Sequence, residues 1–89
     1  MAPRNYSQAA VRFAQYQIFN KLCVAYLRSN DTAFFRAVDL RNELNIPERV
    51  FAETLRAFRH DDQVAVEIIE SDGETYLGLG EYGHGLLNW

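Results

Sequence analysis

Hydrophobic side chains between residues 7 and 28 recur every three or four positions, which is the period of a helix. No Gly or Pro occurs from Ser7 to Ser29, and Ser7 suits the N-cap because its hydroxyl oxygen accepts a hydrogen bond from a free backbone N–H. The pattern predicts one long helix over residues 7–28. Its core-facing stripe is expected to be Val11, Ala14, Ile18, Leu22 and Ala25.

A short β-favouring run and a short helical pattern come next. Residues 33–38 predict a brief strand, because two Phe and a Val favour β structure. Asp39 suits the N-cap of a helix in which Leu40 and Leu44 lie on one face. A second, short helix is therefore expected to follow the strand directly.

A third helix and a hairpin complete the pattern. Pro47 suits the first residue of a helix that runs to about Arg59, with a buried stripe of Phe51, Leu55 and Phe58. Residues 64–69 and 75–79 are strand-like, and Ser71-Asp72-Gly73 between them is typical of a hairpin turn. No linker interrupts the order, so residues 1–89 are expected to form one domain, with 1–6 and 81–89 as tails.

Residues 38–64 resemble a winged helix-turn-helix domain of the kind that bacterial transcriptional regulators use. In that pattern a short helix ends in a Leu, here Leu44, and a tight turn carries a buried aliphatic residue, here Ile46. A recognition helix follows, with Phe51, Leu55 and Phe58 as its apolar positions, and Val64 opens the wing hairpin. The resemblance covers residues 33–79. It implies an α+β fold, a winged helix-turn-helix of three helices with a long first helix and a C-terminal β-hairpin wing.

The turn before the wing departs from that pattern. The family usually has a Gly there, whereas this chain reads His60-Asp61-Asp62-Gln63. Asp tolerates the left-handed backbone conformation that such a turn needs. The departure therefore affects the function of the wing more than the fold.

The resemblance implies binding to double-stranded DNA and a role as a small transcriptional regulator without a ligand domain. A braced helix over residues 48–59 would enter the major groove with its outer face. Arg49 and Arg56 are the cations best placed to reach guanine edges or phosphates. The side chains expected at the DNA are Arg41, Arg49, Ala52, Glu53, Arg56 and Arg59.

A plainer interpretation of the same helix is a salt-bridged surface. Glu53 lies four residues after Arg49 and three before Arg56, which are the spacings of surface ion pairs on a helix. Such pairs would occupy both arginines. The two interpretations of this helix stay open on the sequence alone.

Charge is distributed unevenly along the chain, whose net charge is −3. Residues 1–60 carry every Lys and Arg and a net charge of +4, whereas residues 61–89 carry acids only and a net charge of −7. The expected wing holds Glu67, Glu70 and Asp72 with Glu74, and acids near phosphates oppose DNA binding. The alternative function is therefore a protein-interaction module that does not bind DNA and turns an acidic wing toward a basic protein partner.

Enzyme chemistry finds little support in the sequence, and neither a cofactor nor a metal is expected. Cys23 lies in an apolar row, where a cysteine behaves as a small hydrophobe, and His60 and His84 lack metal-ligand spacing. The glycines at 78, 80 and 83 fit G-x-G-x-x-G formally, but no helix is expected after them, so they indicate turns. With no secretory or membrane-spanning segment apparent, the expected location is the cytoplasm.

The first helix carries more apolar surface than one small domain covers. Beside the core stripe runs a second row, Phe13, Tyr16, Phe19, Cys23 and Tyr26. This row predicts a homodimer in which the first helices pair about a two-fold axis. The competing interpretation is that Leu86, Leu87 and Trp89 fold back over the row within one chain.

Overall fold

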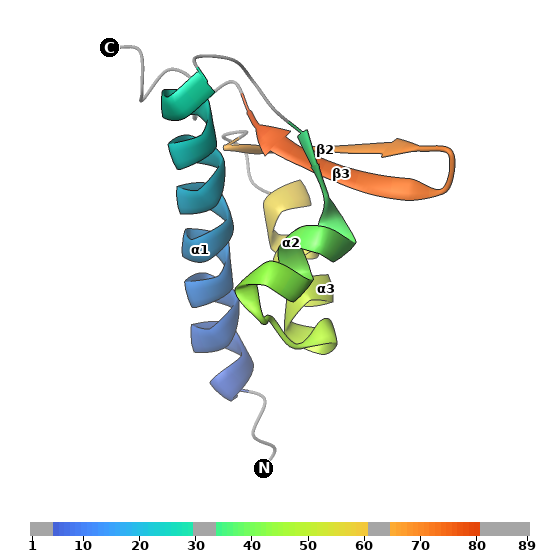
Figure 1. Cartoon of the computed structure of the whole chain (residues 1–89). Coiled ribbons are helices and arrows are strands. Elements are labelled where there is room, and N and C mark those ends of the chain that lie inside the picture. Colours follow the sequence, from blue (N-terminus) through green and yellow to red (C-terminus); the bar gives the residue numbers. More distant parts are fainter. Residues whose placement is uncertain (1–4, 30–33, 61–64, 81–89) are drawn as a thin grey trace.

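The computed structural model describes residues 5–29, 34–60 and 65–80, and in the first helix the side chains from Gln8 to Arg28. It shows an α+β architecture with three helices and a three-stranded antiparallel sheet, which confirms the predicted fold class at that level (Figure 1). The elements are α1 (Asn5–Ser29), β1 (Phe34–Arg36), α2 (Ala37–Leu44), α3 (Glu48–Arg59), β2 (Val66–Ser71) and β3 (Glu74–Leu79).

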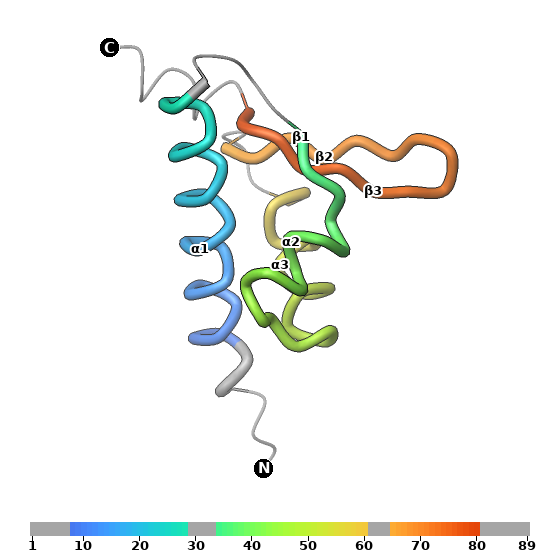
Figure 2. The backbone as a smooth tube through the Cα atoms, in the orientation of Figure 1, coloured from blue at the N-terminus to red at the C-terminus, as the bar shows by residue number. Residues whose placement is uncertain are grey.

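The sheet has the strand order β1-β3-β2, so the short β1 pairs with the returning strand of the hairpin. Asp72 (φ 53°) and Gly73 (φ 79°) both take the left-handed conformation in the turn between β2 and β3. This confirms the predicted hairpin turn, since two-residue turns with two positive φ values suit the twist of paired strands. The hairpin extends away from the helices, as the tube in Figure 2 shows.

Two predicted helix starts are wrong, by two residues for α1 and by three for α2. Helix α1 begins at Asn5, so Ser7 lies inside the helix and is not its N-cap. Helix α2 begins at Ala37 directly after β1, so Asp39 lies in its first turn and Val38 is helical rather than extended. The predicted strand of residues 33–38 is correspondingly shorter, because the helix takes over as soon as β1 has paired with β3.

The turn between α2 and α3 is short and well hydrogen-bonded. Asn45 ends α2 in the left-handed conformation (φ 60°), and its N–H donates to the carbonyl oxygen of Asn42 at 3.2 Å. The N–H of Ile46 donates to the carbonyl oxygen of Arg41 at 3.0 Å, and its side chain is buried. Pro47 is the N-cap of α3 rather than its first residue, and the helix ends at Arg59 as predicted.

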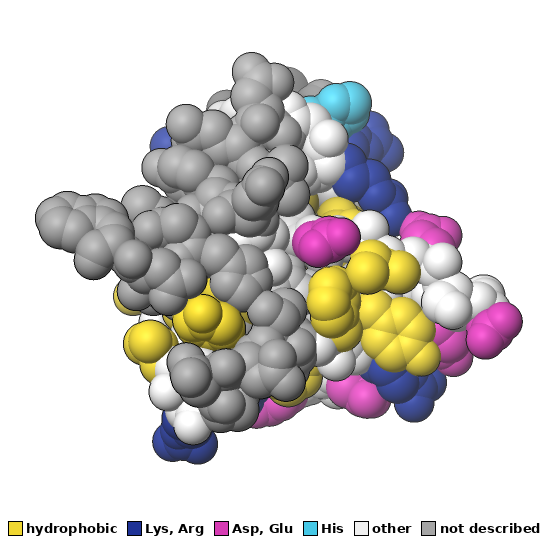
Figure 3. Space-filling model, turned by 90° about the horizontal axis from the view of Figure 1, so that it is seen from above, with side chains coloured by type: hydrophobic (Ala, Val, Ile, Leu, Met, Phe, Trp, Pro, Cys, Tyr) yellow, Lys and Arg dark blue, Asp and Glu magenta, His cyan; other side chains and the backbone are white. Residues whose placement is uncertain are grey.

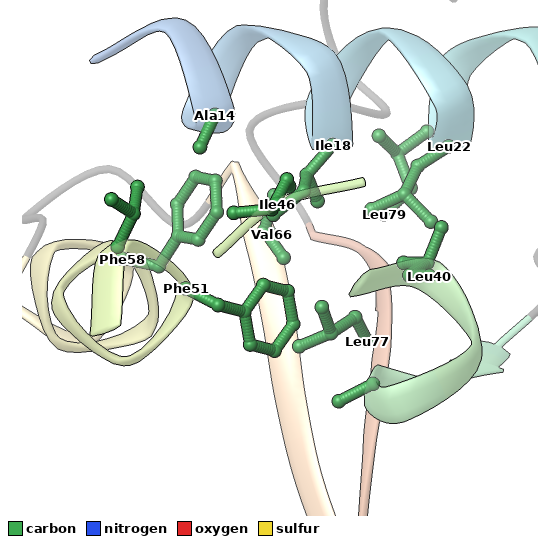
Figure 4. Packing of buried hydrophobic residues seen from close by; sticks show 12 residues of the cluster. Ala14, Ile18, Leu22, Leu40, Ile46, Phe51, Phe58, Val66, Leu77 and Leu79 are labelled. Atoms are coloured by element: carbon green, nitrogen blue, oxygen red, sulfur yellow. The ribbon is translucent and has the colours of Figure 1, made fainter. Parts of the chain in front are cut away.

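The core lies between one side of α1, the α2–α3 pair and the inner face of the sheet (Figure 4). Ala14, Ile18 and Leu22 of α1 are buried as predicted, while Val11 and Ala25 are half-buried. They face side chains from every other element but β1, namely Ala37, Leu40, Ile46, Val50, Phe51, Phe58, Val66, Leu77 and Leu79. Each of α2, α3, β2 and β3 therefore gains its main packing from this one cluster.

The two faces of the sheet differ in burial. Leu77 of β3 points into the core and is fully buried, whereas Ile69, opposite Tyr76 in the register, is 38% exposed. A Cβ on Gly78 would come within 2.6 Å of the Phe34 ring, so this glycine gives the ring its place on the outer face. Viewed from above, hydrophobic side chains gather on the sheet and are bordered by both acidic and basic side chains (Figure 3).

Within the described residues, α1 and the shorter helices all lack the apolar length that a bilayer crossing requires.

The difference between the sheet faces gives a stability prediction. We expect Leu77→Ala to lower the free energy of unfolding by about 2–5 kcal/mol, because it removes a fully buried side chain and leaves a cavity. The matched change Ile69→Ala on the outer face is expected to cost less than about 1 kcal/mol. Urea denaturation of both variants measures the difference. Equal losses would contradict the assignment of inner and outer faces.

Candidate nucleic-acid interface

Helix α3 is sharply two-sided. Val50, Phe51, Thr54 and Phe58 are buried, and the Thr54 hydroxyl donates to the carbonyl oxygen of Val50 at 2.7 Å, which satisfies this polar group inside the core. The outer side is exposed at all six positions that the sequence placed outward: Glu48, Arg49, Ala52, Glu53, Arg56 and Arg59. The prediction of an exposed, charged outer face on this helix is confirmed.

Arg49, Ala52 and Arg56 form the ridge of that face together with the exposed Glu53, because spacings of three and four residues keep all four on one side of the helix. Seven residues separate the two arginines, or about 10 Å along the axis. Half-buried Arg41 of α2 lies nearby, in a groove of about 370 Å³ that it shares with Glu48, Ala52 and the hairpin turn. Arg41 therefore borders α3 at Ala52, whereas the arginines of α3 do not line this groove.

Neither arginine of the ridge has an ion-pair partner among the described residues. The ion pairs found there join Lys21 to Glu43, Arg36 to Glu74 and Arg59 to Glu70. The pairs that the spacing suggested, Arg49–Glu53 and Glu53–Arg56, do not form within this part of the chain. The ion pairs that the spacing suggested are therefore absent from this ridge within the described residues, where Arg49, Glu53 and Arg56 are all exposed.

Two acids of the hairpin are paired with cations from elsewhere in the fold. Arg59 donates to Glu70 at 2.7 Å, and Arg36 donates to Glu74 at 3.3 Å. The hairpin is thus less acidic than its own sequence indicates. The ion pair with Glu70 of β2 also occupies Arg59, which the sequence had assigned to DNA. Asp72, at the tip, has no cation partner within the described residues.

Cys23 is half-buried and packs against the core. Burial raises the pKa of its thiol, because an apolar environment disfavours the charged thiolate. A raised pKa is the opposite of what a nucleophilic cysteine requires. In residues 5–29, 34–60 and 65–80, no three His, Cys, Asp or Glu side chains come together as a metal-binding group.

The remaining sequence candidates lie partly outside the described residues. Gly78 belongs to β3, and Gly80 follows it with its N–H donating to the carbonyl oxygen of Ala65 at 2.8 Å. Gly78 is therefore a residue of the sheet, and Gly80 is hydrogen-bonded directly after it. The rest of the glycine motif, most of the turn after His60, and the tail with His84, Leu86, Leu87 and Trp89 fall outside the described residues.

The second row of α1 does not stay together. Phe19, Cys23 and Tyr26 pack against the core of their own chain, so the expectation that they are left uncovered is wrong. They turn inward because 100° per residue brings them round to the side of α1 next to the core stripe. Phe13 and Tyr16 are exposed as predicted, and Val24 and Leu27 are exposed as well.

No family model, curated protein or solved structure matches this chain.

The raised pKa of Cys23 gives a test of its burial. We expect alkylation by iodoacetamide to be slower than that of a free thiol at pH 8, and its pH midpoint to lie above the ordinary thiol value. Unfolding in urea is expected to return the midpoint to the ordinary value, because the thiolate is then solvated. Following the rate from pH 7 to 10 with and without urea measures this. A midpoint that is lower in the folded protein would contradict it.

Proposed function

We propose that this protein binds double-stranded DNA through α3, as a small winged-helix transcriptional regulator without a ligand domain. The observation that supports this most is the ridge of Arg49, Ala52 and Arg56, whose two guanidinium groups have no carboxylate partner among the described residues. The element order and the strand order β1-β3-β2 are those expected of a winged helix. In this proposal α2 braces α3, and the β2–β3 hairpin is the wing.

A guanidinium without a partner favours DNA for an energetic reason. An arginine that already holds a carboxylate must give up that pair before it binds a phosphate, whereas a solvated arginine gives up only water. Binding then releases counterions from the duplex, which is the main source of affinity at low salt. Ala52 between the two arginines keeps the ridge narrow enough to approach base edges in the major groove.

The wing in this proposal contacts DNA weakly or not at all. The ion pairs of Glu70 with Arg59 and of Glu74 with Arg36 neutralise two of its acids, which lessens their repulsion of phosphates. Exposed Glu67 and Asp72 remain as negative charges. Affinity for DNA would therefore come from α3. Arg41, at the edge of the surface groove between α2 and the hairpin turn, would add a further contact.

Removing the ridge cations tests the proposal directly. We expect Arg49→Ala/Arg56→Ala to weaken binding to random duplex DNA by at least about 30-fold at low salt, since each direct contact contributes about 1–3 kcal/mol. The slope of log K against log salt should also become shallower by about two units. Arg12→Ala/Arg28→Ala removes the same charge from exposed positions of α1 and serves as the control. Equal losses in the two variants, in fluorescence anisotropy titrations, would refute a role for α3.

The Arg59–Glu70 pair gives a second, opposite test. Glu70→Gln removes an acid and releases Arg59 beside α3, so we expect several-fold tighter binding and a salt slope steeper by about one unit. Glu43→Gln makes the same charge change and releases Lys21 on another side of the molecule. Electrophoretic mobility shifts at two salt concentrations compare them. Unchanged binding by Glu70→Gln would place the hairpin away from the DNA.

A protein-interaction module is the second candidate function. The outer face of the sheet favours it, because exposed Phe34 and Ile69 lie there with Glu67, an acid without a cation partner within the described residues. An apolar centre with an acidic border suits a basic protein surface rather than a phosphate backbone. Wild-type protein that does not bind duplex DNA at 50 mM salt would favour this candidate.

A further inference from the structure

Helix α1 carries an exposed apolar stripe on its side away from the core, and the first residue of this stripe, Phe13, also borders a shallow groove beside Leu44 and Pro47. Asn20 follows the fully buried Ile18 by two residues, so it points about 200° away from it around the helix. Around Asn20, the large hydrophobic side chains of this side are exposed by 62% for Phe13, 65% for Tyr16, 41% for Val24 and 64% for Leu27. We call these five residues the outer stripe. It contains no charged side chain.

The outer stripe is symmetric in sequence about Asn20. Tyr16 and Val24 lie four residues before and after it, and Phe13 and Leu27 lie seven residues before and after it. Seven residues are two turns of a helix, so this is also the repeat with which helices pair side by side. When a second α1 runs antiparallel with Asn20 opposite Asn20, each apolar residue therefore meets an apolar residue.

The sizes of the side chains favour the antiparallel direction. The aromatic residues Phe13 and Tyr16 lie in the first half of the stripe, and the aliphatic Val24 and Leu27 in the second. Antiparallel pairing places an aromatic opposite an aliphatic at every level, which keeps the helices evenly spaced. Parallel pairing would bring four aromatic rings together at one end and force the helices apart.

Asn20 suits the centre of such a pair. An amide both donates and accepts hydrogen bonds, so two copies satisfy each other across a two-fold axis. A single Asn in an apolar helix seam also fixes the register, since any shift would leave its amide opposite a hydrocarbon. The one polar residue of the outer stripe thus specifies a single alignment.

The exposed area is sufficient for a modest interface. Aromatic side chains carry about 150–250 Å² each, so the four apolar residues expose on the order of 400 Å² per chain. Two chains would then bury roughly 800 Å² in total, the size of a weak or transient interface. An interface of this size fits a dimer that forms at micromolar rather than nanomolar concentration.

We propose that the outer stripe is the site where a second copy of this chain docks, in an antiparallel, two-fold symmetric pair of α1 helices centred on Asn20. Phe13 of one protomer packs against Leu27 of the partner, and Tyr16 packs against Val24 of the partner. Phe19, Cys23 and Tyr26 stay in the core of their own protomer. The docking does not involve α3 or DNA.

The first experiment measures the mass of the full chain without DNA. Sedimentation equilibrium from 5 to 300 μM is expected to show a shift from 10.3 kDa toward twice that mass. Phe13→Glu and Leu27→Lys are each expected to sediment as monomers, because each places an unpaired charge in the apolar contact. Ile69→Glu, a comparable change on the outer sheet face, is expected to remain dimeric.

A charge-swap variant tests the direction and guards against misfolding. In the antiparallel pair, Phe13→Glu/Leu27→Lys sets the new carboxylate of one chain against the new ammonium of the other at both ends. We therefore expect the double variant to regain the dimer that each single variant loses. In a parallel pair like charges would meet, and the double variant would stay monomeric. Circular dichroism of each variant checks that the helices are retained.

Oxidative cross-linking tests the register in a Cys23→Ala background. Asn20→Cys is expected to link quickly, since the Cα atoms of two residues on the axis come within disulfide range when helices pack about 8–10 Å apart. Phe13→Cys is expected not to link, because its two copies would lie about 21 Å apart along the helices. A wild-type chain that stays at 10.3 kDa at 300 μM, or a dimer lost in Ile69→Glu, would overturn the proposal. Equal linking at positions 13 and 20 would overturn the antiparallel pairing.

Discussion

The burial of Ile18 and Leu22 of α1 against Leu40, Leu77 and Leu79 is the contact on which the rest of this fold depends. The α2–α3 pair and the sheet are too small to cover their own apolar sides, and α1 closes the core over both (Figure 4). Because only one side of α1 does this, its far side is left to solvent. The position of α3 and the exposure of the outer stripe therefore follow from the same packing.

The features that the sequence predicted correctly are those set by the hydrophobic period of a helix or by the backbone preference of a residue type. The stripe of Ala14, Ile18 and Leu22, the outward side of α3, and the Asp72-Gly73 turn were predicted, because each is set by local spacing or backbone preference. The inward side of α3 was predicted only in part, since Phe51 and Phe58 are buried but Leu55 is half-buried, and the buried Val50 and Thr54 were not predicted. Helix starts were less accurate. Ser7 and Asp39 are good N-cap residues, but pairing of β1 starts α2 early and α1 extends past its expected cap. Local capping preferences, worth about 1 kcal/mol, do not decide such boundaries.

What the sequence could not predict are contacts between distant elements. The ion pairs Arg59–Glu70 and Arg36–Glu74 each join two different elements. Sequence spacing within one helix or strand therefore does not predict them. The helical spacing suggested instead that Glu53 would occupy Arg49 and Arg56, which it does not within the described residues. The division of the second row of α1 likewise depends on how far the core wraps around the helix. The core reaches Phe19. It does not reach Val24, an exposed residue that was not part of the predicted second row.

The proposed dimer and the proposed DNA binding are related through the number of phosphate contacts that one protein can make. They do not depend on a contact between the outer stripe and α3. Two free arginines on one α3 give few phosphate contacts, and a lone domain would bind duplex DNA weakly at physiological salt. A two-fold dimer presents two such ridges, and binding of the first raises the local concentration of DNA around the second. Two α3 helices related by a two-fold axis match an inverted repeat, whose half-sites carry the same symmetry. If both proposals hold, a chain with a net charge of −3 would bind DNA by repeating a small basic ridge instead of enlarging it.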